Sequence, residues 1–447
     1  MQLDLSLAFS TGRRAWRRLH RSSLGALLAV TVPLSYETSV PPGGHGDLDS
    51  PAVWLAPNAN SSFLLVTDKT QDYVEIHDPV RNLYLGRMGG HGTTAGRFSR
   101  PNSVAVGYGV ATSAGPLDVA FVVERTNHRI SVFALPFGFY LGSIGDAVLR
   151  EPMGIAVSWD GTQPQIWITD IGFGNQRVFV FDVVPSVTGL TGTQRLAFTA
   201  SPTSILESIV VDRTNGRALV CDEHASDVMV FDLQGIFLGR FGAGHFVNHT
   251  EGIAIYDTGN GAGYVIVTDQ MASPVEWEVF DRQDYHFLCN FSGVTQATDG
   301  IALVQQPLPN FPQGSLFAAH SDRAIHAYDW RNIAAATGLC LAAPGTPVDA
   351  AEPQFHGSNW MTPFRTPFHG TGTLRYRLEA PAPIDVAVYD LRGIVVARLA
   401  HTMQPAGSHV VIWDGRGERG QRLVSGVYFV RAQAGTMSYS QKVTLIR

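Results

Sequence analysis

The chain has 447 residues, of which 45% are hydrophobic and 16% charged, and its formal net charge is −6 at pH 7. This length suits a large repeat fold with a smaller second domain, and the composition provides for well-packed cores. The acidic balance argues against a protein that binds nucleic acid through non-specific positive charge. Three cysteines, none of them in a CxxC pair, exclude a disulfide framework.

The N-terminal segment has a basic run from Gly12 to Arg21, followed by a short apolar stretch from Ser23 to Leu34. This order is typical of an export signal, and the stretch is too short to span a bilayer. We therefore expect residues 1–40 to be an export signal or a disordered N-terminus, although a surface helix or a mis-assigned start codon would also explain them. An extracellular or cell-surface protein without a transmembrane segment is the corresponding expectation.

Strands of three kinds recur with a period near fifty residues. The most visible kind ends in an aromatic or apolar residue and usually Asp: EIHD (75–78), SVFA (131–134), VFVFD (178–182), VMVFD (228–232), WEVFD (277–281) and IHAYD (325–329). Each follows a strand with a polar end and, before that, a first strand such as TEGIAI (250–255). A fourth, outer strand is visible as NLYLGRMG, GFYLGSIG, GIFLGRFG and YHFLCNFSG. Four strands in each of six units predict an all-β fold, a six-bladed β-propeller over residues 41–335.

Acidic residues recur at one end of these strands. Consecutive strands of a blade are antiparallel, so the start of the first strand lies beside the end of the second. The acids that open first strands should therefore gather at one mouth of the central channel: Asp49, Glu207, Glu251 and Asp299. The acids that close second strands share this end: Asp68, Glu124, Asp170, Asp222, Glu223 and Asp269. Hydrogen bonds to the following turn would also explain the second group, as in NHL repeats, which ERTNHRISVF (124–133) resembles.

Carboxylates that converge repel one another unless a cation lies between them. In the absence of Cys or His pairs, such oxygen ligands favour Ca²⁺ over zinc. The chain has only two lysines, and Lys69 follows Asp68 at the expected mouth, with Arg100 and Arg125 at equivalent positions of the second blade. Acids that hold a metal beside cationic side chains suit an anionic, phosphate-bearing ligand. An ordinary surface charge would equally explain Lys69 taken alone.

Four groups of segments carry a family resemblance: GDLDSPAVWLAP with SSFLLVTDK (46–69), RPNSVAVGYG with DVAFVVERTN (118–127), TEGIAIYDTGNGAGYVIVTDQ with VFDR, and TDGIAL with PNFPQGSLFAAH and WRNIA (330–334). In these the chain resembles the β-propeller phytases, calcium-dependent phosphatases that act on inositol hexakisphosphate. The resemblance covers most of residues 45–335. It implies two adjacent phosphate sites bridged by Ca²⁺, with metal-activated water attacking one phosphate while cations neutralise the departing charge.

The resemblance also implies residue roles. The expected calcium- or water-holding positions are Asp49, Glu207, Glu223, Glu251, Gln270 and Asp299. Phosphate binding is expected from Lys69 and Arg125, with Arg100 and Arg177 as further candidates, and catalysis from Lys69, Arg125 and Glu207. The chain departs from the family pattern at Ser50, Ser158, Trp159, His249, Ala297 and Ala302, and it lacks the family's third-blade lysine.

Fewer ligands and fewer cations should weaken the binding of calcium and of a polyphosphate. We therefore weigh a phytase-like phosphatase against a non-catalytic NHL-like propeller that binds a ligand or a protein at the surface. A propeller lactonase or another calcium hydrolase is a third possibility.

The C-terminal part has a different composition. Residues 336–370 are rich in Pro and Gly and predict a linker, whereas short alternating strands over 371–447 predict a small β-sandwich. The block from VYDLRGIVVARL to SGVYFVR closely resembles the FlgD-type immunoglobulin-like domain, which often lies at the C-terminus of exported bacterial proteins, including type IX secretion cargo. The resemblance implies sorting or surface attachment. The expected partners are therefore a small phosphorylated substrate and secretion or cell-surface machinery, with no nucleic acid.

Overall fold

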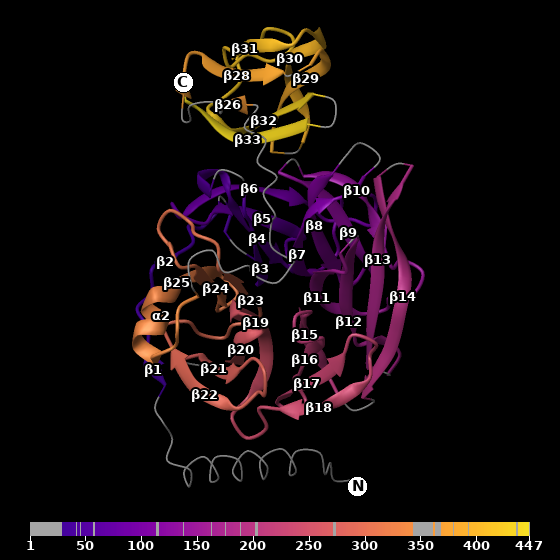
Figure 1. The fold of residues 1–447 in the computed structure, drawn as a ribbon, viewed down its shortest axis with the longest axis vertical. Coiled ribbons are helices and arrows are strands. Elements are labelled where there is room, and N and C mark those ends of the chain that lie inside the picture. The colour runs from indigo at the N-terminus through magenta and orange to yellow at the C-terminus, as the bar shows by residue number, and fades with distance from the viewer. Residues whose placement is uncertain are drawn as a thin grey trace, which may run out of the picture.

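A computed structural model of the chain describes residues 29–446 with short gaps at 42, 45, 57–58, 113–115, 137, 162, 175, 188, 202–203, 271–273, 343–360, 363–367, 379, 392 and 435–436. Most of the expected export signal, residues 1–28, lies outside the described residues. The described part is almost entirely β-structure, arranged as a ring of sheets with a small second domain beside it (Figure 1).

Six antiparallel sheets form the blades of the ring. Blade 1 contains β3 (Leu48–Trp54), β4 (Phe63–Asp68), β5 (Tyr73–Asp78) and β6 (Leu83–Gly89). Blade 2 contains β7 (Pro101–Val110), β8 (Leu117–Glu124), β9 (Arg129–Leu135) and β10 (Phe139–Ile144). Blade 3 contains β11 (Pro152–Trp159), β12 (Pro164–Asp170), β13 (Gln176–Ser186) and β14 (Gly189–Ser201).

The remaining blades follow in chain order. Blade 4 contains β15 (Leu206–Asp212), β16 (Arg217–Asp222), β17 (Asp227–Asp232) and β18 (Phe237–Phe241). Blade 5 contains β19 (His249–Gly259), β20 (Ala262–Gln270), β21 (Glu276–Asp281) and β22 (Phe287–Ser292). Blade 6 contains β23 (Ile301–Val304), β24 (Ser315–His320) and β25 (Ala324–Asp329). Each first strand contacts the first strand of the next blade, and β23 contacts β3, so the six blades close a ring and confirm the predicted propeller.

The N-terminal residues complete the last two blades. The strand β2 (Tyr36–Glu37) pairs with β25 as the outer strand of blade 6, and β1 (Val30–Thr31) adds a fifth strand to blade 5. The amides of Ser35 and Thr38 donate to the carbonyls of Ala327 and Ile325, both at 2.9 Å. Residues 30–38 are thus part of the propeller, in contrast to the expectation that residues 1–40 form a signal or a disordered segment.

Apolar residues hold neighbouring blades together. The middle strands of a blade are covered on both faces, so their sequences read as nearly continuous apolar runs rather than as alternating patterns. Phe121 and Val123 of β8, for example, pack with Ile166 and Ile168 of β12 in the next blade, and all four side chains are fully buried. These interblade cores fix the positions of the first strands, which line the channel.

The C-terminal domain is a small sandwich. One sheet contains β26 (Met361–Thr362), β28 (Gly372–Leu378) and β31 (Gly407–Trp413). The other contains β27 (Phe368–His369), β33 (Met437–Ile446), β32 (Gly426–Ala434), β29 (Ala382–Tyr389) and β30 (Val395–Gln404). The domain therefore begins before residue 371, and the helix α2 (Trp330–Thr337) extends the propeller past residue 335.

The two domains share a buried interface. The rings of Tyr389 and Phe139 lie 5.3 Å apart and those of Phe429 and Phe63 6.2 Å apart, in edge-to-face arrangements. Lys442 Nζ lies 3.3 Å from Asp78 Oδ2, and both side chains are buried. Asp68 at the end of β4 pairs with Leu48 and Tyr73, so Phe63 and Asp78 lie at the opposite end of blade 1 from the predicted acidic mouth.

Candidate functional site

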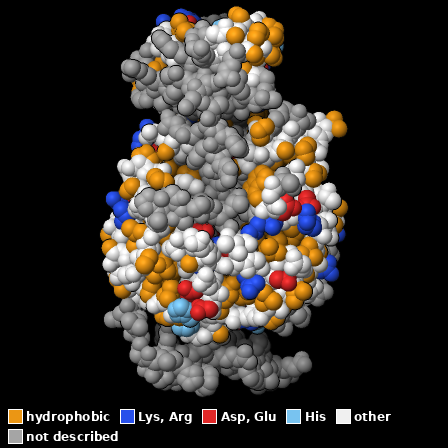
Figure 2. All heavy atoms as spheres, viewed as in Figure 1, with side chains coloured by type: hydrophobic (Ala, Val, Ile, Leu, Met, Phe, Trp, Pro, Cys, Tyr) orange, Lys and Arg blue, Asp and Glu red, His pale blue; other side chains and the backbone are white. Residues whose placement is uncertain are grey.

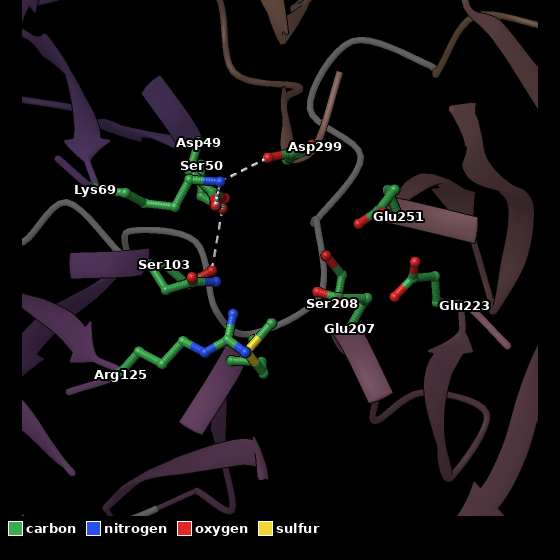
Figure 3. A pocket seen from close by; sticks show the side chains of 14 residues that line it. Asp49, Ser50, Lys69, Ser103, Arg125, Glu207, Ser208, Glu223, Glu251 and Asp299 are labelled. Atoms are coloured by element: carbon green, nitrogen blue, oxygen red, sulfur yellow. Dashed lines mark hydrogen bonds and ion pairs between the residues drawn. The ribbon is translucent and has the colours of Figure 1, made fainter. Parts of the chain in front are cut away.

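A pocket of about 190 Å³ lies at the predicted mouth of the channel. Residues from all six blades line it (Figure 3). The register of the blades shows why. In each of the first five blades, the first strand has a β-bulge at this end, where two of its residues oppose one residue of the second strand. Bulges turn side chains away from the regular alternation and are common beside active sites.

The bulge residues are the ones that line the pocket: Asp49 and Ser50, Asn102 and Ser103, Met153 and Gly154, Glu207 and Ser208, and Glu251 with Gly252 beside it. The glycines allow the first strands to come close together. A Cβ atom at Gly252 would lie 2.9 Å from the carbonyl oxygen of Asp299, and one at Gly154 would lie 2.5 Å from that of Glu207. In TEGIAI the glycine is therefore a requirement of strand packing, whereas the bulge places the acid before it at the pocket.

On one side of the pocket, Lys69 gathers three carboxylates. Its Nζ lies 2.9 Å from Asp49 Oδ2, 3.0 Å from Asp299 Oδ2 and 3.3 Å from Asp47 Oδ1. Burial and the charge of Asp299 raise the pKa of Asp49 to about 6, although Lys69 acts in the opposite direction. Burial tends to lower the pKa of Lys69, but the charges of Asp49 and Asp299 outweigh it and raise that pKa. Lys69 is therefore protonated at neutral pH.

Further hydrogen bonds complete the environment of these two acids. The Ser50 hydroxyl donates to Asp49 Oδ1 at 2.6 Å, and the Gln270 amide donates to Asp299 Oδ1 at 2.6 Å. Ser103 in turn donates to the Ser50 hydroxyl at 3.2 Å. Asp49 and Asp299 thus already have partners for both of their carboxylate oxygens.

Three glutamates occupy the other side of the pocket, namely Glu207, Glu223 and Glu251 (Figure 3). Glu223 has a partner, because His249 Nδ1 lies 3.0 Å from its Oε1. Within the part of the chain that the structure describes, no hydrogen bond or ion pair involves the carboxylate of Glu207 or of Glu251. Burial, followed by the charges of the neighbouring carboxylates, raises the pKa of both groups well above the usual glutamate value. Two unpaired acids side by side favour a cation or a proton between them.

Arg125 extends toward the pocket from blade 2 (Figure 3). Its Nε donates to Glu151 Oε1 at 2.9 Å, and its Nη2 donates to the same oxygen. Glu151 was not among the expected site residues; it directly precedes Pro152, the first residue of β11, whereas Asp49, Glu207 and Glu251 lie within their first strands.

The acids that close second strands are structural, with the exception of Glu223. Asp68 accepts hydrogen bonds from the amides of Gly46 and Gln71, and Asp269 accepts from those of Val247 and Asn248. Glu124 accepts hydrogen bonds from Arg129 and Ser131, and Asp170 accepts from the amides of residues 150 and 172. Asp222 accepts from Ser204 and Arg240. These contacts hold the loop before each first strand against the turn after the second.

The structure separates the remaining candidates from the pocket. Arg100 is exposed, and its amide donates to Asp72 Oδ1 at 2.6 Å. Arg177 lies on β13, the third strand of its blade, and does not line the pocket. Ser158 and Trp159 lie at the far end of β11, paired with Gln165 and Pro164, so those departures from the family pattern do not touch the mouth. Gln270 contributes through Asp299 rather than as a lining residue.

Two other groups of side chains place metal-ligand atoms within 4.8 Å of one another among the described residues. They are Glu37 with His320 and His326, and Asp281 with Asp284 and His286, and both lie away from the channel pocket. Among the described residues, no three carboxylates of the pocket have oxygen atoms that all lie within 4.8 Å of one another. Since Ca²⁺ holds its oxygens at about 2.3–2.6 Å, ligands of one ion lie within about 5 Å of one another, and the glutamates would have to move together to bind it.

On the face shown in Figure 2, acidic and basic side chains of the described residues are scattered among apolar and neutral ones. None of the helices in the described ranges is long and apolar enough to cross a membrane.

Comparisons with known proteins identify the C-terminal domain. Residues 364–438 match the FlgD Ig-like domain, which is compatible with an exported or surface protein. Among solved structures, the chain is similar to a streptogramin B lyase (12% identity, TM-score 0.40, covering 66% of this chain and 85% of that one). It is also similar to a putative gluconolactonase (14% identity, TM-score 0.42, covering 68% of this chain and 95% of that one). A further similar structure is Kuenenia stuttgartiensis hydrazine synthase (14% identity, TM-score 0.42, covering 61% of this chain and 81% of that one). Likenesses this weak carry no functional assignment. No curated protein matches the chain. The chain thus combines a six-bladed propeller with a C-terminal domain that matches the FlgD Ig-like domain.

Proposed function

We propose that the protein is an exported, calcium-dependent phosphomonoester hydrolase of the β-propeller phytase type, acting on phytate or a related phosphorylated compound at the channel mouth. One observation carries this proposal. The unpaired carboxylates of Glu207 and Glu251 face a pocket that Arg125 and Lys69 also line. Acids without counter-charge beside cationic side chains suit a metal ion together with an anion.

The donor set fits a hard cation. Glu207, Glu223 and Glu251 offer carboxylate oxygens, which Ca²⁺ prefers, and no sulfur atom of cysteine lines the pocket among the described residues. These three glutamates would hold the ion. When bound, calcium would supply positive charge that polarises a phosphoryl oxygen and lowers the pKa of a bound water.

The side chains of the pocket would divide the remaining tasks. The guanidinium of Arg125 would bind the phosphate by parallel hydrogen bonds and stabilise its developing charge. Glu207 would orient the attacking water beside the ion and accept its proton. Water then bonds to phosphorus, the bond from phosphorus to the ester oxygen breaks, and the alcohol leaves with a proton. Lys69 would keep Asp49 and Asp299 in place.

An NHL-like binding module is the second candidate, and a specific observation favours it. Lys69 is already matched by three carboxylates, an arrangement that is stable without an anionic ligand. In that case the pocket would bind a ligand or a protein segment without turnover. The match of the C-terminal domain supports, for either candidate, a role of that domain in sorting or in attachment to secretion or cell-surface machinery.

The test is phosphate release from inositol hexakisphosphate and from a simple phosphomonoester, with calcium and with a chelator. We expect calcium-dependent release that falls by about a hundredfold or more in Glu207→Gln and Glu251→Gln, in line with the loss of a catalytic base or metal ligand. Glu418→Gln is the matched control, because Glu418 is an exposed glutamate of the C-terminal domain. Absence of release by folded, calcium-loaded protein would favour the binding module.

A further inference from the structure

The charge of the pocket limits the kind of anion that it can accept. Among the described lining residues, five are carboxylates and two are cationic, Lys69 and Arg125. The three ion pairs of Lys69 with Asp47, Asp49 and Asp299, at 2.9–3.3 Å, already compensate its charge. Arg125 is therefore the principal group left to bind an anion.

Glu151 determines which edge of Arg125 is available. One oxygen of Glu151 accepts hydrogen bonds from both Nε and Nη2 of Arg125, and Glu151 itself does not line the pocket. A guanidinium has five N–H groups, so the edge that includes Nη1 still has donors for a ligand. Glu151 thus holds the side chain from outside while the opposite edge is presented to the pocket. One planar edge with parallel donors matches one phosphate group.

The size of the pocket also limits the ligand to one phosphate group at this site. Its volume of about 190 Å³ is smaller than the roughly 300–1,000 Å³ of common ligand sites. A phosphate group with a few neighbouring atoms fits such a space. Further phosphates on the same ligand would lie beside the acids around Lys69, or beside Glu207, Glu223 and Glu251, whose three negative charges exceed the two positive charges of one bound Ca²⁺, so like charges still repel them.

We infer that the site binds a single phosphate group of a small phosphomonoester, not an inositol polyphosphate, and that Glu151 is the positioning residue for Arg125. The inference rests on the proposed function. Of the substrates proposed there it keeps a related phosphomonoester and excludes phytate, so calcium-dependent phosphate release is then expected from the simple phosphomonoester alone.

The test compares phenylphosphonate with 1,4-phenylenebisphosphonate, which share one ring, resist hydrolysis and differ by one anionic group. Calorimetric titration of the calcium-loaded full chain in 0.15 M NaCl should show binding of phenylphosphonate and at least about fivefold weaker binding of the bisphosphonate, because of like-charge repulsion. Arg125→Ala should weaken phenylphosphonate binding about tenfold or more, the usual effect of losing a charge-assisted pair.

Variants of Glu151 test its positioning role. Glu151→Gln keeps an oxygen that accepts from Arg125 and should retain most of the affinity for phenylphosphonate. Glu151→Ala should bind phenylphosphonate severalfold more weakly, with an unchanged melting temperature. Affinity that rises in both variants, or stays unchanged in both, would show that Glu151 does not position Arg125.

The two proposals fail in different ways. Tighter binding of the bisphosphonate, together with calcium-dependent hydrolysis of inositol hexakisphosphate, would overturn the single-phosphate inference and leave the proposed function standing. Failure of the folded, calcium-loaded protein to bind either phosphonate would overturn both.

Discussion

The carboxylates at the channel mouth fall into two groups that differ in counter-charge. Asp49 and Asp299 are matched by Lys69, whereas Glu207 and Glu251 have no such partner among the described residues. Burial and the nearby acids raise the pKa of Glu251 in the folded protein. Its ionisation therefore costs more free energy in the folded state than in the unfolded state. Without calcium, stability is highest below the unfolded value near 4.5 and falls as the pH rises through the folded pKa.

This difference predicts that Glu251→Gln stabilises the calcium-free protein. In the presence of a chelator at pH 8, the melting temperature should rise by a few degrees, since the variant has no charge to repel Glu207. Below pH 4.5 the two proteins should melt alike. Added calcium should raise the melting temperature of the original protein more than that of the variant. Equal melting temperatures in chelator at pH 8 would contradict the unpaired state of Glu251.

The sequence predicts the acids of the site better than their partners. Asp49, Glu207, Glu251 and Asp299 could be placed together because antiparallel pairing puts all starts of first strands at one end. Arg177 directly precedes VFVFD (178–182), which the repeat makes a third strand, so the periodicity itself places this side chain away from the channel. The ion pair of Arg125 with Glu151 joins residues of two blades and leaves no local pattern.

At the level of elements, outer strands were predictable only where they follow the common pattern. The strands β6, β10, β18 and β22 all contain the expected aromatic or apolar segment. The strand β14 (Gly189–Ser201) has another pattern, LTGTQRLAFTAS, and was not predicted. The outer strand of blade 6 is β2, which lies almost three hundred residues from its partner β25, so no repeat period could identify it.

The strand β2 provides the next prediction. Its contacts include the side chain of Thr38, which accepts from the amide of Ile325 at 2.9 Å, and the Tyr36 hydroxyl, which donates to the carbonyl of Pro79 at 2.7 Å. A chain that starts at Ser39 loses these contacts and exposes an edge of blade 6. A chain that starts at Ala29 retains them and is the matched control. We expect the shorter chain to melt at least several degrees lower, measured by circular dichroism. Similar melting of both would show that residues 29–38 do not stabilise the propeller.

At the scale of the whole molecule, the C-terminal domain is an integral part of the packing. Phe429 is 1% exposed and Phe63 is fully buried, and both belong to one apolar core that extends through blades 1 and 2. Leu391 fills the space at Gly86, where a Cβ atom would lie 2.6 Å from it. This interface leaves the catalytic candidates at the other end of blade 1 accessible, so a docked domain and an open pocket are compatible.

The buried ion pair of Lys442 with Asp78 tests how firmly the domains are joined. Burial lowers the pKa of Lys442, although the charge of Asp78 partly restores it. Asp78 has other partners, since Arg81 Nε lies 2.9 Å from Oδ2 and the amides of Val80 and Arg81 donate to Oδ1. Without Lys442, the Asp78 carboxylate therefore keeps its ion pair with Arg81 and its hydrogen bonds from the two amides. We expect Lys442→Met to cost about 1–3 kcal/mol, less than the roughly 3–5 kcal/mol for stranding a buried charge.

Arg81→Met is the matched control, because it removes a half-exposed partner from the same carboxylate and should cost less than about 1 kcal/mol. Urea unfolding gives both values. Scanning calorimetry of the original chain should show one transition for both domains, since separation would expose the apolar surface around Phe63 and Phe429 to water. Two transitions, with Lys442→Met shifting neither, would mean that the domains are tethered rather than packed, and that the C-terminal domain acts as an independent module.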